Sequence, residues 1–166
     1  MKSVFLSPVV CNAGPLIGLA RIHLEGLPFQ LFPEVIVPEE VRQELLIKDS
    51  PDHEPLEIVL GQATIHPRQL QPDRMLLAEL DVGETAVIMA ALQLGISSVL
   101  LDEKKARRIA ARVYGLQVKG TAGLLLEAKN RGMIEAVRPG LEAMIQGGYF
   151  LGPNLVAACL AAAGEI

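Results

Sequence analysis

Four polar residues of the chain either follow an apolar run or lie in an expected helix, and all carry oxygen ligands: Asn12, Glu44, Glu84 and Asp102. Asn12 directly follows Val9-Val10-Cys11, and Asp102 directly follows Val99-Leu100-Leu101, so both lie where a buried strand would pass into a loop. Open α/β sheets bind ligands at this carboxyl edge. Three carboxylates gathered there would repel one another unless they were protonated or neutralised, and hard oxygen ligands suit Mg²⁺ or Mn²⁺. The sequence therefore predicts a divalent metal site.

Glu44 also has an ordinary structural interpretation. The sequence predicts a helix over residues 39–48, with Pro38 at its first turn, and Glu44 stands beside Leu45 at the edge of the apolar stripe. Taken alone, this position favours a boundary glutamate whose stem packs while its carboxylate reaches water. Glu40, one turn earlier, is the alternative ligand.

Helix capping is the competing role for the other two carboxylates. Asp81 and Glu84 have the spacing of a capping box, which favours capping for Asp81 and leaves capping and metal binding equally supported for Glu84. Asp102 could cap a helix that begins near Lys104. Capping and metal binding can coexist at Asp102, which is the strongest single candidate.

Charge is distributed unevenly along the chain. The net charge is −4, yet six of the fifteen basic residues fall between positions 104 and 119, directly after Asp102. Three of them recur at a helical spacing of four and form what we call the basic ridge: Lys104, Arg108 and Arg112. The apolar residues of the same segment are predicted to form its buried face: Ala106, Ile109, Ala110 and Val113. The ridge is either ordinary solvated surface or a contact for phosphates or for the acidic segment of a partner.

Composition narrows the class of protein. A chain of 166 residues with 51% hydrophobic and 4% aromatic residues is expected to form one domain, residues 1–166, with an aliphatic core and without aromatic platforms for stacked bases. Cys11 and Cys159 lack metal-ligand spacing and are expected to be buried free thiols. The apolar segment 155–163 is too short to span a bilayer, and the N-terminus makes a poor secretory signal. We therefore expect a cytoplasmic protein without membrane contact.

Strands and helices alternate along most of the chain. Strands are expected in the apolar run that ends at Cys11 and at residues 35–37, 63–65, 97–101 and 116–119. Helices are expected at 16–22, 39–48, 83–94, 104–114, 122–130, 139–146 and 153–163, with 49–73 a variable connection and 133–166 a helical extension of the same domain. This alternation predicts βαβ units around a parallel sheet. Neither a nucleophile–base pair nor a phosphate-binding glycine loop is present, which leaves metal-dependent hydrolysis.

Five segments, in order and at reasonable spacing, resemble the PIN-like domains, in particular a prokaryotic group related to VapC-type toxins. They cover most of the chain: residues 10–17, 37–45, 80–86, 100–107 and 119–125. The resemblance implies a Rossmann-like three-layer α/β/α domain with a mainly parallel sheet. It also implies an Mg²⁺- or Mn²⁺-dependent ribonuclease site in which Glu44, Glu84 and Asp102 match family metal-site acids.

One position departs from that family pattern. The first strand of active PIN nucleases ends in Asp, whereas this chain has Asn12 there. An amide oxygen can ligate a hard cation but has no net charge, so weaker metal binding or an inactive site both follow. The leading hypothesis is a ribonuclease acting on single-stranded RNA, as a toxin or a processing enzyme. The alternative is a catalytically silent module that binds RNA or a protein partner. A metal-dependent phosphatase is disfavoured because no Asp nucleophile follows the first strand.

The C-terminal segment also suggests an interaction. Residues 155–163 are apolar on nearly all sides, more than a single core contact requires. A homodimer or an antitoxin-like partner is expected to cover them.

Overall fold

A five-stranded sheet lies at the centre of the protein. The computed structural model describes residues 5–47 and 51–166. Its strands are β1 (Val9–Cys11), β2 (Val35–Pro38), β3 (Thr64–His66), β4 (Ser98–Leu100) and β5 (Gln117–Lys119), in the order β3-β2-β1-β4-β5. All four pairings are parallel. The central strands consist of fully buried apolar residues, as expected when helices cover both faces of a sheet.

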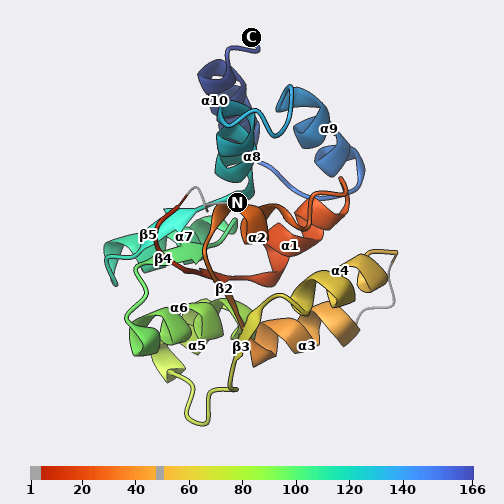
Figure 1. Ribbon diagram of the computed structural model, residues 1–166. Coiled ribbons are helices and arrows are strands. Elements are labelled where there is room, and N and C mark those ends of the chain that lie inside the picture. Colours follow the sequence, from red (N-terminus) through yellow and green to blue (C-terminus); the bar gives the residue numbers. More distant parts are fainter. Residues whose placement is uncertain (1–4, 48–50) are drawn as a thin grey trace.

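Helices form the outer layers. The first half of the chain supplies α1 (Ala13–Ala20), α2 (Leu27–Leu31), α3 (Glu39–Ile47), α4 (His53–Leu60) and α5 (Arg74–Glu79). The second half supplies α6 (Val82–Leu94), α7 (Lys104–Arg112), α8 (Thr121–Asn130), α9 (Arg138–Gln146) and α10 (Pro153–Ala163). Helix α6 packs on β1, β2 and β4, while α1 packs against α3, α4 and α8. Figure 1 shows α5 and α6 below the sheet and α8 above it. The expected three-layer α/β/α architecture is confirmed.

The strand order of the sheet has a switch point between β1 and β4. From β1 it moves outward to β2 and β3, and it then returns to the opposite side of β1 with β4 and β5. Cys11 pairs with Leu100, and the Asn12 amide donates a hydrogen bond to the Leu100 carbonyl at 3.1 Å. Asn12 and Asp102 therefore leave the sheet at its topological switch point, where ligands of such folds bind.

Most predicted elements are present with small changes in their ends, but α1 begins earlier than expected. Residues 13–15 form its first turn rather than a connection, because Pro15 there lacks only an N–H that the first turn leaves unpaired. Three short helices, α2, α4 and α5, were not predicted, and α4 lies inside the segment expected to be a variable connection. The expected helix end at residue 48 and the start of that connection lie outside the described residues.

The C-terminal helices lie on the same side of the sheet as α8, as Figure 1 shows. Helix α10 packs against α8 through Cys159 and Leu160, while Leu155 is 45% exposed. Both cysteines are buried free thiols, as predicted. In the described part of the chain, no helix is long and apolar enough to cross a membrane.

Candidate functional site

Asn12, Glu44 and Gly83 meet, although they come from three separate parts of the fold: the start of α1, α3 and α6. A Cβ atom at Gly83, in the first turn of α6, would lie 3.1 Å from Glu44 Oε2 and 3.2 Å from Asn12 Oδ1. The absence of a side chain at this glycine is therefore what lets both oxygens approach the helix. Asn12 is 9% exposed, and its Oδ1 atom has no hydrogen-bond partner among the described residues. A buried, unpaired carbonyl oxygen is costly, and a cation or a water molecule would satisfy it.

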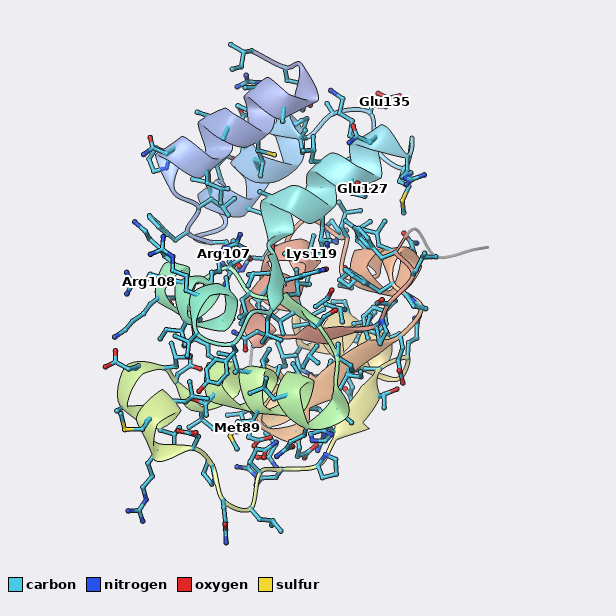
Figure 2. All side chains as sticks on the ribbon, turned by 90° about the vertical axis from the view of Figure 1, so that its left-hand side faces the viewer. Met89, Arg107, Arg108, Lys119, Glu127 and Glu135 are labelled. Carbon is cyan, nitrogen blue, oxygen red and sulfur yellow. The ribbon has the colours of Figure 1, made fainter. Side chains whose placement is uncertain are left out.

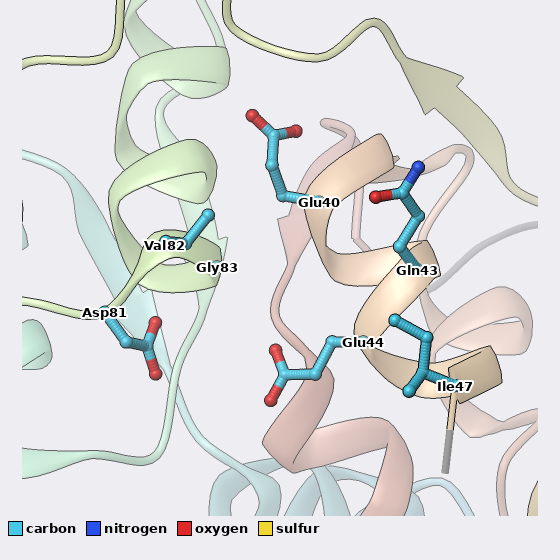
Figure 3. Close-up of a pocket in the computed structure, with 7 residues that line it drawn as sticks. All are labelled: Glu40, Gln43, Glu44, Ile47, Asp81, Val82 and Gly83. Atoms are coloured by element: carbon cyan, nitrogen blue, oxygen red, sulfur yellow. The ribbon is translucent and has the colours of Figure 1, made fainter.

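An acidic pocket opens beside this pair. It has a volume of about 420 Å³, and its polar wall contains Glu40, Glu44 and Asp81. Figure 3 shows Glu44 on α3 and Asp81 at the start of α6 with their carboxylates facing each other across it. Glu40 is 8% exposed; one of its carboxylate oxygens accepts the Gln69 amide at 2.9 Å, and the other has no hydrogen-bond partner in the described chain. The pocket thus presents acceptor oxygens beside the apolar side chains of Ile47 and Val82.

Glu84 performs the capping role that the sequence left open. Its carboxylate accepts the Asp81 amide at 3.1 Å, while the Asp81 carboxylate accepts the Glu84 amide at 2.7 Å, so the predicted capping box is present. Glu84 is only 6% exposed. Burial is the main cause that raises its pKa to about 7; the nearby charges of Asp81 and Glu103 contribute in the same direction, and the hydrogen bond from the Asp81 amide opposes them. Near neutral pH, Glu84 is therefore poised between its acid and carboxylate forms.

One alternative expected Asp102 to cap α7, and this expectation is wrong. Glu103 is the N-cap, accepting the Ala106 amide at 2.8 Å. Asp102 instead reaches across to the start of α8, where its Oδ1 atom accepts the Thr121 amide at 2.8 Å and its Oδ2 atom accepts the Thr121 hydroxyl. The alternative failed because a strand-end carboxylate can meet the helix that follows the neighbouring strand as readily as its own, and only the sheet order decides between them.

Tyr149 and Arg107 also contact this region and were not identified from the sequence. The Tyr149 hydroxyl donates a hydrogen bond to Asp102 Oδ2, and Arg107 donates to the Leu101 carbonyl at 2.8 Å. Burial and the Asp102 charge raise the pKa of Tyr149 far above its usual range, so this hydroxyl remains a proton donor. The only sequence signal for Tyr149 is the pair of glycines on α1, Gly14 and Gly18, which leave room for its ring.

The basic ridge is exposed along α7. All three side chains of the ridge are exposed to solvent: Lys104, Arg108 and Arg112. On the opposite face of α7, Ala106 and Ala110 are fully buried. Figure 2 shows Arg108 on the outside of α7 and Arg107 closer to the sheet. The predicted buried face is wrong at Val113, which is 68% exposed, because α7 ends at Arg112 and the chain turns before Val113 can pack.

Comparison with protein families agrees with the fold. A family model described as a PIN domain matches residues 8–165. The chain therefore belongs to the PIN domain family. The searches of curated proteins and of solved structures returned no match to the chain.

The fit of this site to the divalent metal of PIN domains is partial. Among the residues that the structure describes, no three Asp, Glu, His or Cys side chains are arranged to hold a metal ion. Asn12 and Glu44 do bring oxygens to one point beside Gly83, and Asn12 Oδ1 is buried without a partner. The four candidate ligands are thus oxygen donors, which suit a hard divalent cation. Asn12 and Glu44 already lie close together, whereas Glu84 and Asp102 are held by other contacts.

Proposed function

We propose that the protein is a metal-dependent ribonuclease that hydrolyses phosphodiester bonds in single-stranded RNA. The observation that carries the proposal is the unpaired, buried Oδ1 atom of Asn12 beside Glu44 at the switch point of a PIN domain. Asn12, Glu44, Glu84 and Asp102 would hold Mg²⁺ or Mn²⁺. When bound, such a cation supplies Lewis-acid chemistry, by lowering the pKa of water and by offsetting charge on the phosphate.

The side chains would divide the remaining work. Glu44 lines an acidic pocket that leads to the site and is the acceptor best placed to receive a proton from water entering there. Glu84, with a pKa raised to about 7, can exchange a proton near neutral pH. The basic ridge would bind the phosphates that flank the scissile bond, since its three cations are exposed along the helix that follows Asp102.

The test is cleavage of a mixed-sequence single-stranded RNA with manganese present. We expect wild-type protein to cleave, and we expect chelator, Glu44→Gln and Asp102→Asn each to abolish cleavage. Glu54→Gln is the matched control, because Glu54 is an exposed glutamate on α4 outside the site. Loss of cleavage in the control as well, or cleavage that survives Glu44→Gln, would refute this assignment.

A second function is favoured by the departure at Asn12. With an amide at the end of β1 and with Asp102 already bound by Thr121 and Tyr149, the site has fewer available charges than four carboxylates would supply. In this alternative the domain binds RNA or an antitoxin-like partner without chemistry. Wild-type protein that neither cleaves RNA nor binds manganese in calorimetry would favour it. As a toxin, the protein would form a homodimer or bind its antitoxin through α10, which has Leu155 partly exposed.

A further inference from the structure

Tyr149 reaches the site from the C-terminal part of the chain, and a tight turn aims it there. The turn follows α9 at Gly147 and Gly148, where Gly148 has a φ of 86° that favours glycine. The Tyr149 amide donates to the Met144 carbonyl at 2.9 Å, and Arg21 at the end of α1 donates to the Gly147 carbonyl at 2.8 Å. The turn is thus closed on α9 and attached to α1.

Two glycines on α1 form a notch for the tyrosine. A Cβ atom at Gly18 would lie 3.0–3.1 Å from three carbons of the Tyr149 ring. A Cβ atom at Gly14, one helical turn earlier, would lie 3.3 Å from the Tyr149 hydroxyl oxygen. A side chain at either position would force the tyrosine to shift by a few tenths of an ångström, so the α1 backbone helps to set the place of the hydroxyl.

The hydroxyl completes the hydrogen bonding of one Asp102 oxygen. A carboxylate oxygen accepts about two hydrogen bonds. Within residues 5–47 and 51–166, Oδ2 receives two hydroxyl donors, Thr121 and Tyr149, whereas Oδ1 receives the Thr121 amide alone. Asp102 is therefore held between the start of α8 and the C-terminal segment, with one acceptor position remaining on Oδ1.

We propose that Tyr149 is a positioning residue of this site: its hydroxyl, seated in the Gly14–Gly18 notch, fixes the Asp102 carboxylate so that one Oδ1 acceptor position stays open for a ligand. The inference rests on the proposed function in one respect, that this ligand is a divalent cation. It makes the turn after α9 a part of the site, contributed by a segment 47 residues beyond Asp102.

Carboxyl NMR without metal tests the contact itself. The chain has five aspartates, so protein labelled with ¹³C at the aspartate carboxyl gives few signals, and Asp102→Asn identifies that of Asp102 by its loss. In the presence of chelator, we expect Tyr149→Phe to shift the Asp102 signal. Tyr114→Phe, the same change at the one other tyrosine, should leave it in place. An Asp102 signal that does not move in Tyr149→Phe would overturn the proposal.

Manganese calorimetry tests what the contact does for the site. We expect Tyr149→Phe to weaken binding by about tenfold or more, the usual cost of removing a group that orients a metal ligand. Its thermal unfolding midpoint should fall below that of Tyr114→Phe, because only Tyr149→Phe removes the hydrogen bond to the Asp102 carboxylate. Gly18→Ala, which keeps the hydroxyl but displaces the ring, should weaken binding too. Unchanged or tighter binding in both variants would overturn the proposal. Wild-type protein that binds no manganese would instead refute the proposed function, and the metal-free carboxyl shift would then alone decide the role of Tyr149.

Discussion

Replacing Gly83 with alanine would place a methyl group against the two oxygens that meet at α6. The added carbon would lie 3.1 Å from Glu44 Oε2 and 3.2 Å from Asn12 Oδ1, so each oxygen would have to retreat by a few tenths of an ångström. Metal–ligand distances tolerate changes of only about 0.2 Å. We therefore expect Gly83→Ala to weaken manganese binding by about tenfold or more, as do other changes that misplace metal ligands.

The effect of the same substitution on stability separates crowding from unfolding. Alanine is favoured over glycine inside a helix by roughly 0.8–1.0 kcal/mol. Gly123, in the first turn of α8, is exposed and has no atom within 4 Å of its would-be Cβ, so Gly123→Ala is the matched control and should gain about 0.5–1 kcal/mol. Gly83→Ala should gain less, because crowding offsets the helical preference.

Urea denaturation and manganese calorimetry on the two variants give both quantities. If Gly83→Ala gained as much stability as Gly123→Ala and bound manganese like the wild type, the idea that Asn12 and Glu44 share a site beside Gly83 would be refuted. A loss of affinity in Gly123→Ala would equally show that the assay reports general changes in the fold.

Three further predictions concern charge. Asn12→Asp adds a buried carboxylate beside Glu44, so it should lower the free energy of unfolding in chelator and tighten manganese binding; unchanged calorimetric affinity would remove Asn12 from the site. Because the pKa of Glu84 rises from 4.5 to about 7 on folding, the native state holds this proton more tightly than the unfolded chain, and stability without metal should fall as the pH rises across that interval. Glu84→Gln, which can keep the capping box, should flatten this part of the urea-denaturation profile; an unchanged slope would contradict the assignment. Reversing the three charges of the basic ridge should weaken RNA binding. It should also reduce the slope of log affinity against log salt concentration by about 0.7 per lost phosphate contact. Arg74→Glu, a control at an exposed position, should change neither quantity, and equal effects in the two variants would make the ridge ordinary surface.

The fold was largely predictable because its signals are local. Buried strands such as Val35–Pro38 read as short apolar runs, and the helix that follows opens with two glutamates, which helix N-termini favour. The helices that the sequence did not reveal are short: Leu27–Leu31 has five residues, Arg74–Glu79 has six and His53–Leu60 has eight. Segments of this length have little periodicity to detect, and tertiary packing rather than propensity forms them.

The capping box shows where local pattern and site chemistry overlap. The spacing of Asp81 and Glu84 predicted the cap correctly, since a cap is a contact between residues three apart. The same spacing said nothing about the burial that raises the Glu84 pKa, because that depends on what packs over the start of α6.

The sequence alone determined which types of residue stand at the ends of β1 and β4. It also predicted that they meet at one edge of the sheet, because parallel strands must present their carboxyl ends together. Which neighbour each side chain takes was decided only by the tertiary structure. Asp102 is held by Thr121 and by Tyr149, which lies 47 residues away, and Asn12 meets Glu44 because Gly83 leaves space between elements distant in the chain. Contacts of this kind depend on strand order and on the close approach of backbones, and neither leaves a periodic signal in the sequence.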